Sequence, residues 1–346
     1  MKIAAFNVGP LNNVYSGKHT YVDVFIPFLN ELTRQNIEVD WVGITLENKE
    51  HNKKLDKLKI HLGYADIISM DSKIKKLNKS WDFIDPSEYD AFICQPRPDI
   101  CKLENEILFT LINRFLDANK KVFIWELDMF LDGFTDRMKN ECILLHPAIL
   151  PPKKFATEIY FPFFTHSVYE QKIQQSIERD LDFLLIANIY GRNEQAMQFF
   201  KPLEDAPFDK LIFGSWIETD ARRQFAEQFK NFEFAGNCEF WAANPLMRRA
   251  KATLHIVPDF ARDRGLMTAR VFVSQMNRCL CYCDSKIVGA EKFFPTELIV
   301  KDGNEIKERW NSVQEHREDL LAQRDELLKE HTVEKRVSYF IKLLHE

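Results

Sequence analysis

The stretch Phe183–Lys201, FLLIANIYGRNEQAMQFFK, contains the alternation that decides the fold. Phe183–Ala187 is an apolar run that predicts a buried strand, and apolar residues return at helical spacing in Glu194–Lys201. The loop between them carries Gly191 and Arg192. A buried strand that leads through a short loop into a helix is the repeating unit of parallel sheets covered by helices.

The same alternation extends in both directions along the chain. On the N-terminal side we expect strands at Ile3–Val8, Val39–Ile44, Asp90–Cys94, Lys121–Trp125, Ile143–Leu145 and Glu158–Phe161, and helices at Tyr21–Arg34 and Leu103–Leu116. On the C-terminal side we expect strands at Lys210–Phe213, Phe232–Ala235, Ala252–Val257, Leu280–Cys283 and Leu298–Val300, and helices at Asp220–Lys230, Trp241–Arg249, Thr268–Met276, Glu305–Lys329 and Val333–Leu344. The segment FPFFTH, Phe161–His166, is typical of an interdomain connector. These patterns predict an α/β protein of two Rossmann-like domains, with ligands at the carboxyl ends of the strands.

The composition is that of a globular protein with a large core. The chain has 346 residues, 45% of them hydrophobic, and roughly 150 residues per domain predicts two domains. Lys and Arg total 47 and Asp and Glu total 52, so the net charge of -5 argues against non-specific coating of nucleic acid. No targeting peptide is recognisable, and no run reaches the roughly 18 apolar residues of a membrane helix, so we expect no membrane partner.

The cysteine and glycine content indicates the cellular compartment and excludes one kind of nucleotide-binding loop. The seven cysteines include no C-x-x-C pair, which indicates a reducing, cytoplasmic compartment. Cys279, Cys281 and Cys283 alternate along a predicted strand; reduced thiols are the expectation and a zinc cluster the alternative. With only 11 glycines, a glycine-dense nucleotide loop is not expected.

The loop Pro258–Phe272, PDFARDRGLMTARVF, is the strongest candidate for a phosphate site. Three arginines surround a helix that starts at Thr268: Arg262, Arg264 and Arg270. Guanidinium groups match phosphate oxygens, and a helix N-terminus adds partial positive charge, so the loop could hold a diphosphate without a metal. The alternative is a surface loop in which the arginines pair with Asp259 and Asp263.

Two further loops follow predicted strands. Asn188–Glu194 combines Gly191 with Arg192 before a helix and could cradle an anion, although it lacks G-x-G-x-x-G and could be an ordinary turn. Phe234–Phe240 carries Gly236 and could present backbone groups to a nucleobase.

The loop after Lys121–Trp125 is rich in carboxylates: Glu126, Asp128 and Asp132. A carboxylate at a strand end among aromatic side chains could act as a general base, and the alternative is a helix cap or a surface carboxylate. Glu126-x-Asp128 and Asp180-x-Asp182 also imitate a metal-binding D-x-D pair.

These residues resemble the GT-B glycosyltransferases, and within them the DNA β-glucosyltransferases of T-even phages. That family transfers a sugar from a UDP donor to 5-hydroxymethylcytosine in duplex DNA. The resemblance lies in the opening M-K-I-A, in Lys121–Asp128, in Leu181–Phe200 with its G-x-x-E core, in Ile212–Gly214 and in Pro258–Val271.

The resemblance implies a fold and a set of site residues. It implies two Rossmann-like domains that face a central cleft, with the C-terminal helix packing back on the N-domain: an acceptor domain over residues 1–165, a UDP-sugar domain over 166–328 and a C-terminal helix over 329–346. It places Asp128 as the general base. The donor residues that it implies, taken together with the loops above, are Gly191, Arg192, Gly214, Gly236, Cys238, Phe240, Asp259, Arg264, Thr268 and Arg270.

The expected reaction is an inverting transfer from a UDP-sugar, with no obligatory metal. Retaining relatives often show a glutamate pair near the donor loop, and none lies between His255 and Ser285. Where the family places a glutamate on the donor ribose, this chain has Val273. The transferred sugar could therefore be glucose or a pentose such as arabinose.

Hydroxymethylated duplex DNA is the expected acceptor, bound by a monomer in the cytoplasm, which is the host cytoplasm if the chain is phage-encoded. Basic residues that could contact its phosphates are Lys53, Lys54, Lys57, Lys73, Lys75, Lys76, Arg248 and Arg249. The alternative for each is a solvated helical face. Other functions left open are a GT-B enzyme acting on a polysaccharide, lipid or protein, a metal-dependent transferase of GT-A type, and a non-catalytic nucleotide-sugar-binding module.

Overall fold

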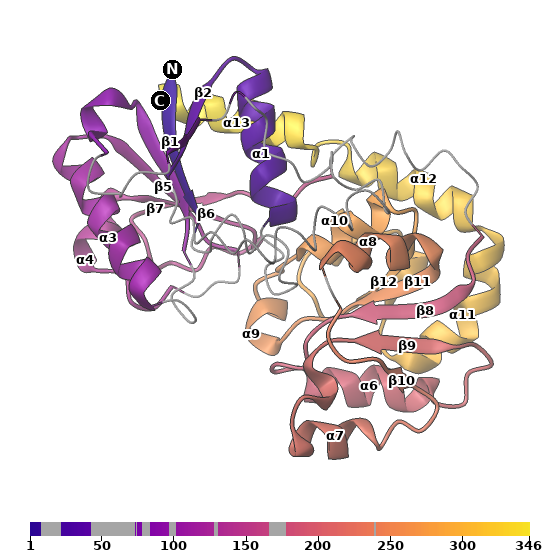
Figure 1. Cartoon of the computed structure of the whole chain (residues 1–346). Helices are drawn as coiled ribbons and strands as arrows, with labels where there is room; N and C mark the ends of the chain where they lie inside the picture. Colours follow the sequence, from indigo (N-terminus) through magenta and orange to yellow (C-terminus); the bar gives the residue numbers. More distant parts are fainter. Residues whose placement is uncertain are drawn as a thin grey trace. The chain divides into compact units, whose positions relative to one another are not determined.

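The computed structural model describes residues 1–7, 22–42, 73, 75–77, 84–96, 102–127, 131–165, 178–238 and 240–346. Contacts divide the chain into two units. Unit 1 comprises Met1–Pro162 and Val333–Glu346, and unit 2 comprises Phe163–Thr332. Figure 1 shows both units, each with its own sheet and helices.

Unit 1 is built on a parallel sheet whose described strands run in the order β3-β2-β1-β4-β5-β6-β7. The strands are β1 Lys2–Asn7, β2 Glu38–Val42, β3 Lys75–Leu77, β4 Ala91–Gln95, β5 Lys121–Trp125, β6 Ile143–His146 and β7 Thr157–Tyr160. The helices are α1 Val22–Arg34, α3 Lys102–Asp117, α4 Asp136–Glu141 and α13 Val333–His345, with a 3₁₀ helix at Pro86–Glu88. The strand order reverses direction between β1 and β4, as in doubly wound folds.

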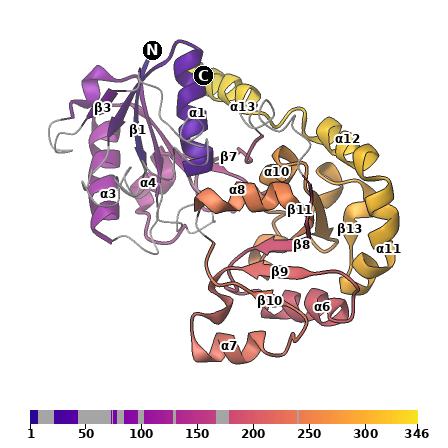
Figure 2. The same cartoon turned by 45° about the vertical axis from the view of Figure 1, so that its right-hand side comes forward.

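The core of unit 1 explains why its central strands read as continuous apolar runs. Every residue of β4 is buried, and Phe92 stacks on Phe115 of α3 with ring centroids 4.6 Å apart. Helix α13 covers the other part of this core, where Phe340 meets Phe28 of α1 at 5.3 Å. The Lys121 ammonium donates to the Leu343 and Leu344 carbonyls at the end of α13. The C-terminal helix therefore packs against α1, as predicted (Figures 1 and 2).

Unit 2 is built on a second parallel sheet, with described strands in the order β10-β9-β8-β11-β12-β13. The strands are β8 Leu181–Ile186, β9 Lys210–Phe213, β10 Glu233–Phe234, β11 Ala250–His255, β12 Leu280–Asp284 and β13 Ile299–Val300. The α-helices are α6 Asn193–Leu203, α7 Asp220–Ala226, α8 Phe240–Arg249, α9 Asp259–Arg262, α10 Ala269–Met276, α11 Gly303–Glu315 and α12 Arg317–Leu328. Short 3₁₀ helices lie at Ser215–Ile217, Ala290–Lys292 and Thr296–Leu298. The order reverses between β8 and β11, so the carboxyl ends of these two strands form the switch point where doubly wound folds bind ligands.

The three cysteines at β12 belong to the core of unit 2. Cys279, Cys281 and Cys283 are fully buried, and burial raises the pKa of each thiol, to about 12 for Cys279. Among the described residues, no three His, Cys, Asp or Glu side chains gather as metal ligands would. The three thiols are therefore buried, protonated groups of the core.

The structure corrects three expected elements. β3 lies inside the lysine-rich segment, where no strand was expected, and it pairs in parallel with β2. The helix expected over Glu305–Lys329 is two helices, α11 and α12. The helix expected over Asp220–Lys230, α7, ends at Ala226.

None of the helices in the described ranges is both long and apolar enough to cross a membrane.

Candidate functional site

The loops after β8 and β11 meet at the switch point of unit 2. The Gly191 backbone has φ +62°, and a Cβ there would lie 3.3 Å from Cβ of Pro258. Gln195 Nε2 donates to Asp259 Oδ1 at 2.6 Å, across the same junction. Two loops far apart in sequence thus form one edge, with backbone and charged groups close together.

A glycine turn joins the loop after β9 to the loop after β8. Gly214 has φ +138°, and a Cβ there would lie 2.0 Å from the Ala187 carbonyl oxygen, which no side chain could tolerate. Its N–H donates to the Gly236 carbonyl at 2.6 Å, and the Trp216 indole N–H donates to the same Ala187 carbonyl at 2.6 Å. The carboxyl ends of β8, β9 and β10 are therefore held against one another.

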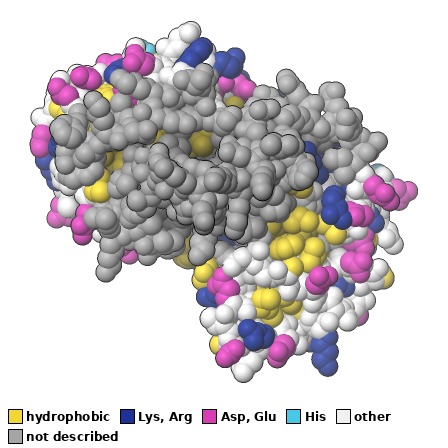
Figure 3. Space-filling model, in the orientation of Figure 1, with side chains coloured by type: hydrophobic (Ala, Val, Ile, Leu, Met, Phe, Trp, Pro, Cys, Tyr) yellow, Lys and Arg dark blue, Asp and Glu magenta, His cyan; other side chains and the backbone are white. Residues whose placement is uncertain are grey.

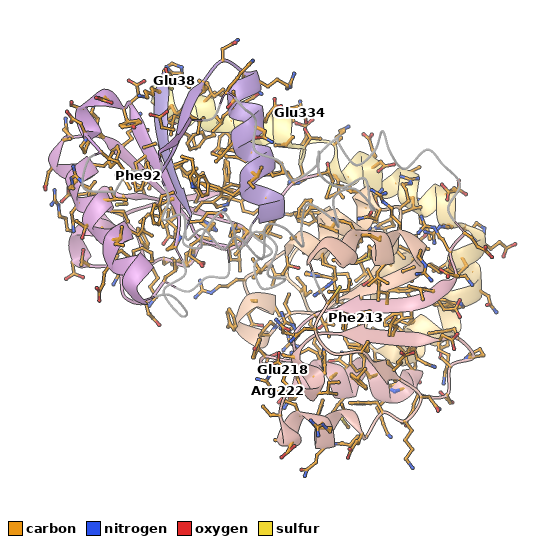
Figure 4. The ribbon with its side chains drawn as sticks, viewed as in Figure 1. Glu38, Phe92, Phe213, Glu218, Arg222 and Glu334 are labelled. Carbon is orange, nitrogen blue, oxygen red and sulfur yellow. The ribbon has the colours of Figure 1, made fainter. Side chains whose placement is uncertain are left out.

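An exposed aromatic ring lies beside this turn. Tyr190 is 54% exposed, and the Arg222 guanidinium lies 4.8 Å from the centre of its ring. Arg222 donates to Glu218 at 3.0 Å, and Glu218 accepts from the Asn237 amide at 2.6 Å. Figure 4 shows Glu218 and Arg222 together at this end of unit 2. The network fixes one face of the Tyr190 ring.

Arg270, in the first turn of α10, is the central cation of the site. Its Nη2 donates to the Ile186 carbonyl at the end of β8, at 2.8 Å. Its Nε and Nη1 are buried and have no hydrogen-bond partner among the described residues. Burial lowers the pKa of the Arg270 guanidinium to about 10, so the group remains charged at neutral pH. A cation with two buried, unsatisfied donors is suited to bind an anion.

His255, the last residue of β11, lies beside this cation and was not among the predicted site residues. It is fully buried, and its pKa lies well below 6.5, first because of desolvation and then because of the Arg270 charge. Its Nε2 lies 3.3 Å from the Leu266 carbonyl oxygen and its Nδ1 3.5 Å from Thr268 Oγ1. In the sequence it is one polar residue at the end of an apolar strand, which gave no signal of a role.

The neighbouring arginines are already engaged. Arg192 donates to the main-chain carbonyls of Asn188 and Ile256 at 2.9 and 3.3 Å, so it ties the two loops together. Arg262 pairs with Asp259 at 2.9 Å and approaches the buried Asp284 at 3.9 Å. Arg262 thus forms the ion pair with Asp259 that the alternative described, and phosphate roles for Arg262 and Arg192 stay predictions.

The remaining donor predictions fall near the same edge. Cys238 follows β10 and is half-buried, Arg264 follows α9 and is half-buried, and Phe240 begins α8, its side chain lying outside the description. The predicted base Asp128 is the third residue after β5 and lies outside the described residues.

The predicted DNA contacts are divided between the two units, and several of them lie outside the described residues. Lys53, Lys54 and Lys57 lie outside them; Lys73 is exposed; Lys75 and Lys76 lie on strand β3, not on a helical face, and their side chains are not described. Arg249 forms a two-pronged ion pair with Asp180, and Arg248 donates to Asn277 at 3.0 Å. Both arginines precede β11, at the amino edge of the sheet and away from the switch point. On the face of unit 2 in Figure 3, the described basic and acidic side chains are interspersed.

Comparisons with known proteins show what this arrangement is similar to. No protein-family model matches the sequence, and no curated protein matches it. Among solved structures, T4 phage BGT in complex with UDP and Mn²⁺ matches with 17% identity over 100% of both chains and a TM-score of 0.66. The DNA modifying enzyme β-glucosyltransferase, solved with and without uridine diphosphoglucose, matches with 18% identity over 100% of both chains and a TM-score of 0.64. A glycosyltransferase from Rickettsia africae matches with 9% identity over 99% of this chain and 97% of its own, at a TM-score of 0.57.

The fold is that of the GT-B glycosyltransferases. This confirms the predicted fold class and the resemblance on which it rested. Because the identities are low, the match carries the architecture and not the identity of the donor or the acceptor, and those rest on the residues of the site.

Proposed function

We propose that this chain is a UDP-sugar-dependent glycosyltransferase that acts on 5-hydroxymethylcytosine in DNA. The observation that carries the donor half of the proposal is Arg270, a half-buried cation with two buried, unsatisfied donors at the switch point. A diphosphate supplies the oxygens that these donors lack, and the N-terminus of α10 adds favourable partial charge. The solved GT-B neighbours include complexes with UDP and with UDP-glucose.

Donor binding in this proposal uses unit 2. Arg270 and the Thr268 end of α10 hold the diphosphate, while Arg264 lies on the same loop. Gly191, Gly214 and Gly236 allow the backbone to approach the ligand, and Asp259, Cys238 and Phe240 contribute to sugar and base contacts. Arg192 holds the two loops in place and is proposed to contact the diphosphate as well.

The chemical step is an inverting displacement. Asp128 removes the proton of the acceptor hydroxyl while that oxygen forms a bond to the anomeric carbon of the sugar. The bond from that carbon to the UDP oxygen breaks, and its electron pair remains on the departing diphosphate. Arg270 stabilises the developing charge there, which is where electrostatic stabilisation lowers a barrier most.

DNA is the proposed acceptor because one matching structure is described as a DNA modifying enzyme. The target base leaves the helical stack to reach the enzyme, as is usual for enzymes that modify a base. The sugar is glucose or a pentose such as arabinose, since Val273 replaces the carboxylate that the family uses on the donor ribose. We propose that the enzyme is a cytoplasmic monomer with no obligatory metal.

The experiment that tests this function is mass spectrometry of hydroxymethylated duplex DNA after incubation with a panel of UDP-sugars. A mass increase of one hexose or one pentose on the modified base identifies acceptor and sugar together. Unmodified DNA serves as the control. UDP binding without transfer to any DNA would reject the DNA acceptor in favour of another one, and loss of activity in EDTA would reject the metal-free mechanism.

The general base is tested by Asp128→Asn. We expect the transfer rate to fall by about 10²–10⁴-fold, because the amide cannot accept the proton. UDP binding, measured by calorimetry, should remain. Near-normal turnover in this variant would show that another group is the base.

A further inference from the structure

We propose that His255 is a positioning residue for the donor diphosphate: it holds the Thr268 hydroxyl and so keeps the N-terminus of α10 uncapped for the ligand. The inference rests on the donor site of the proposed function. It concerns a residue that the resemblance does not assign, and its argument comes from the hydrogen-bond partners of the imidazole.

The tautomer of His255 follows from its two neighbours. The Leu266 carbonyl can only accept a hydrogen bond, so Nε2, 3.3 Å away, carries the proton. Nδ1 is then a bare acceptor, and the Thr268 hydroxyl at 3.5 Å donates to it. The proton positions are thus assigned by the partners, and the imidazole is neutral with the hydrogen on Nε2.

The surroundings keep the imidazole neutral. Desolvation lowers the His255 pKa most, and the charges of Arg270, Arg192 and Arg324 lower it further. Arg324 lies 4.8 Å from the ring centre of Phe294, which in turn lies 6.4 Å from the His255 ring. Three positive charges oppose a fourth, so Nδ1 stays free to accept from Thr268.

Thr268 differs from two other threonines that directly precede described helices. Thr135 before α4 and Thr219 before α7 each accept from a first-turn N–H, at 3.3 Å in both cases. Thr268 has the extended backbone of an N-cap, yet its side chain makes no such bond. Because its hydroxyl is turned to His255, the first-turn N–H groups of α10 are left without that oxygen, and the Val271 N–H donates to the Thr268 carbonyl at 3.0 Å instead.

Two groups of α10 therefore lack a side-chain acceptor at the same place. One is the helix N-terminus, and the other is the buried pair of donors on Arg270. A hydroxyl that capped the helix would compete with an anion for the N–H groups. His255 removes this competitor without adding a charge of its own.

Two near-isosteric variants separate the two hydrogen bonds of the imidazole. His255→Asn places an amide oxygen near the Nδ1 position and keeps an acceptor for Thr268. His255→Gln places an amide nitrogen near the Nε2 position, keeping the donor to Leu266 but losing the acceptor. Both are titrated calorimetrically with UDP, with uridine, which lacks the diphosphate, and with inorganic diphosphate.

We expect His255→Gln to lower the affinity for UDP and for inorganic diphosphate by about 3–10-fold, as for loss of a helix-terminus contact. The affinity for uridine should not change. His255→Asn should restore UDP binding to within about twofold of the unsubstituted protein. Equal effects of the two variants, or an equal loss for uridine, would overturn the inference. If the unsubstituted protein binds neither UDP nor diphosphate, the proposed donor site fails and this inference with it.

A measurement on the unsubstituted protein keeps the test independent of any variant. Nitrogen NMR of the histidine side chains distinguishes the two neutral tautomers and the imidazolium. A neutral His255 with the proton on Nε2 is expected near neutral pH, and a proton on Nδ1 would contradict the proposal even if both variants failed to fold.

Discussion

The basic side chains at the two edges of the sheet in unit 2 differ in whether a carboxylate neutralises their charge. At the amino edge, Arg249 pairs with Asp180, and Lys251 pairs with Asp182 at 2.6 Å. At the carboxyl edge, Arg270 is charged and half-buried, and its buried Nε and Nη1 have no partner within the described chain. The charges of Arg249 and Lys251 at the amino edge are therefore neutralised by carboxylates of the same unit.

This difference separates stabilising charges from binding charges. Exposed ion pairs such as Arg249–Asp180 contribute little to stability, about 0–1 kcal/mol. A buried guanidinium without a carboxylate costs stability, and proteins retain such a group where function requires it. Arg270 is therefore best explained by an anion that binds there.

The largest expected effect concerns the glycine turn that shapes the carboxyl edge. Gly214→Ala would place a Cβ 2.0 Å from the Ala187 carbonyl, so we expect a loss of at least ~3 kcal/mol in the free energy of unfolding. Gly236→Ala is the matched control, because its φ is also positive (+76°) but the nearest atom is 4.0 Å away. It should cost only about 1 kcal/mol. Similar losses in urea unfolding would show that the close approach is not rigid.

The next effect is the pH dependence that His255 imposes on this edge. Its folded pKa lies below the usual 6.5, so below that pH the unfolded chain takes up a proton that the folded chain refuses. Stability is complete above the unfolded pKa and falls with decreasing pH, by up to about 1.4 kcal/mol per pH unit. The difference in unfolding free energy between the unsubstituted protein and His255→Gln should therefore shrink or reverse from about pH 7 to about pH 5. A constant difference would mean that His255 does not titrate with a lowered pKa.

Removing the buried charge should stabilise the empty protein. Arg270→Met keeps a long side chain but loses the guanidinium with its two unsatisfied donors, so we expect the free energy of unfolding to stay equal or to rise by up to about 1 kcal/mol, and the melting temperature not to fall. Thermal unfolding without ligand measures this. A clear loss of stability would show that Arg270 serves the fold.

The smallest effect is expected at the amino edge. Arg249→Gln should lower the free energy of unfolding by less than about 1 kcal/mol, and the loss should diminish as salt is added. Urea unfolding at low and high salt checks both points. A large, salt-independent loss would contradict the view that this pair is a solvent-screened surface contact.

Much of the fold was predictable because buried parallel strands are apolar along their whole length. Lys121–Trp125 and Lys210–Phe213 are strands with the predicted bounds. Lys75–Leu77 was missed because an edge strand of three residues with two lysines has no apolar alternation. The break between α11 and α12 at His316 could not be predicted, because no proline or glycine marks it in the sequence.

The candidate site could be predicted where its residues are neighbours in the sequence. Thr268 and Arg270 stand two residues apart at a helix start, so their proximity follows from the sequence alone. His255 was missed because its role depends on Leu266 and Thr268, which the fold brings around its ring. Likewise, the occupation of Arg192 by the carbonyls of its own and a neighbouring loop cannot be deduced from spacing.

The most direct test of the central claim is a calorimetric titration of UDP into three proteins: the unsubstituted chain, Arg270→Met and Arg249→Gln. The account predicts that UDP binds the first and third equally and binds Arg270→Met at least about 30-fold more weakly, as expected for loss of charge-assisted hydrogen bonds. Equal affinity for UDP in the unsubstituted protein and Arg270→Met would contradict the account.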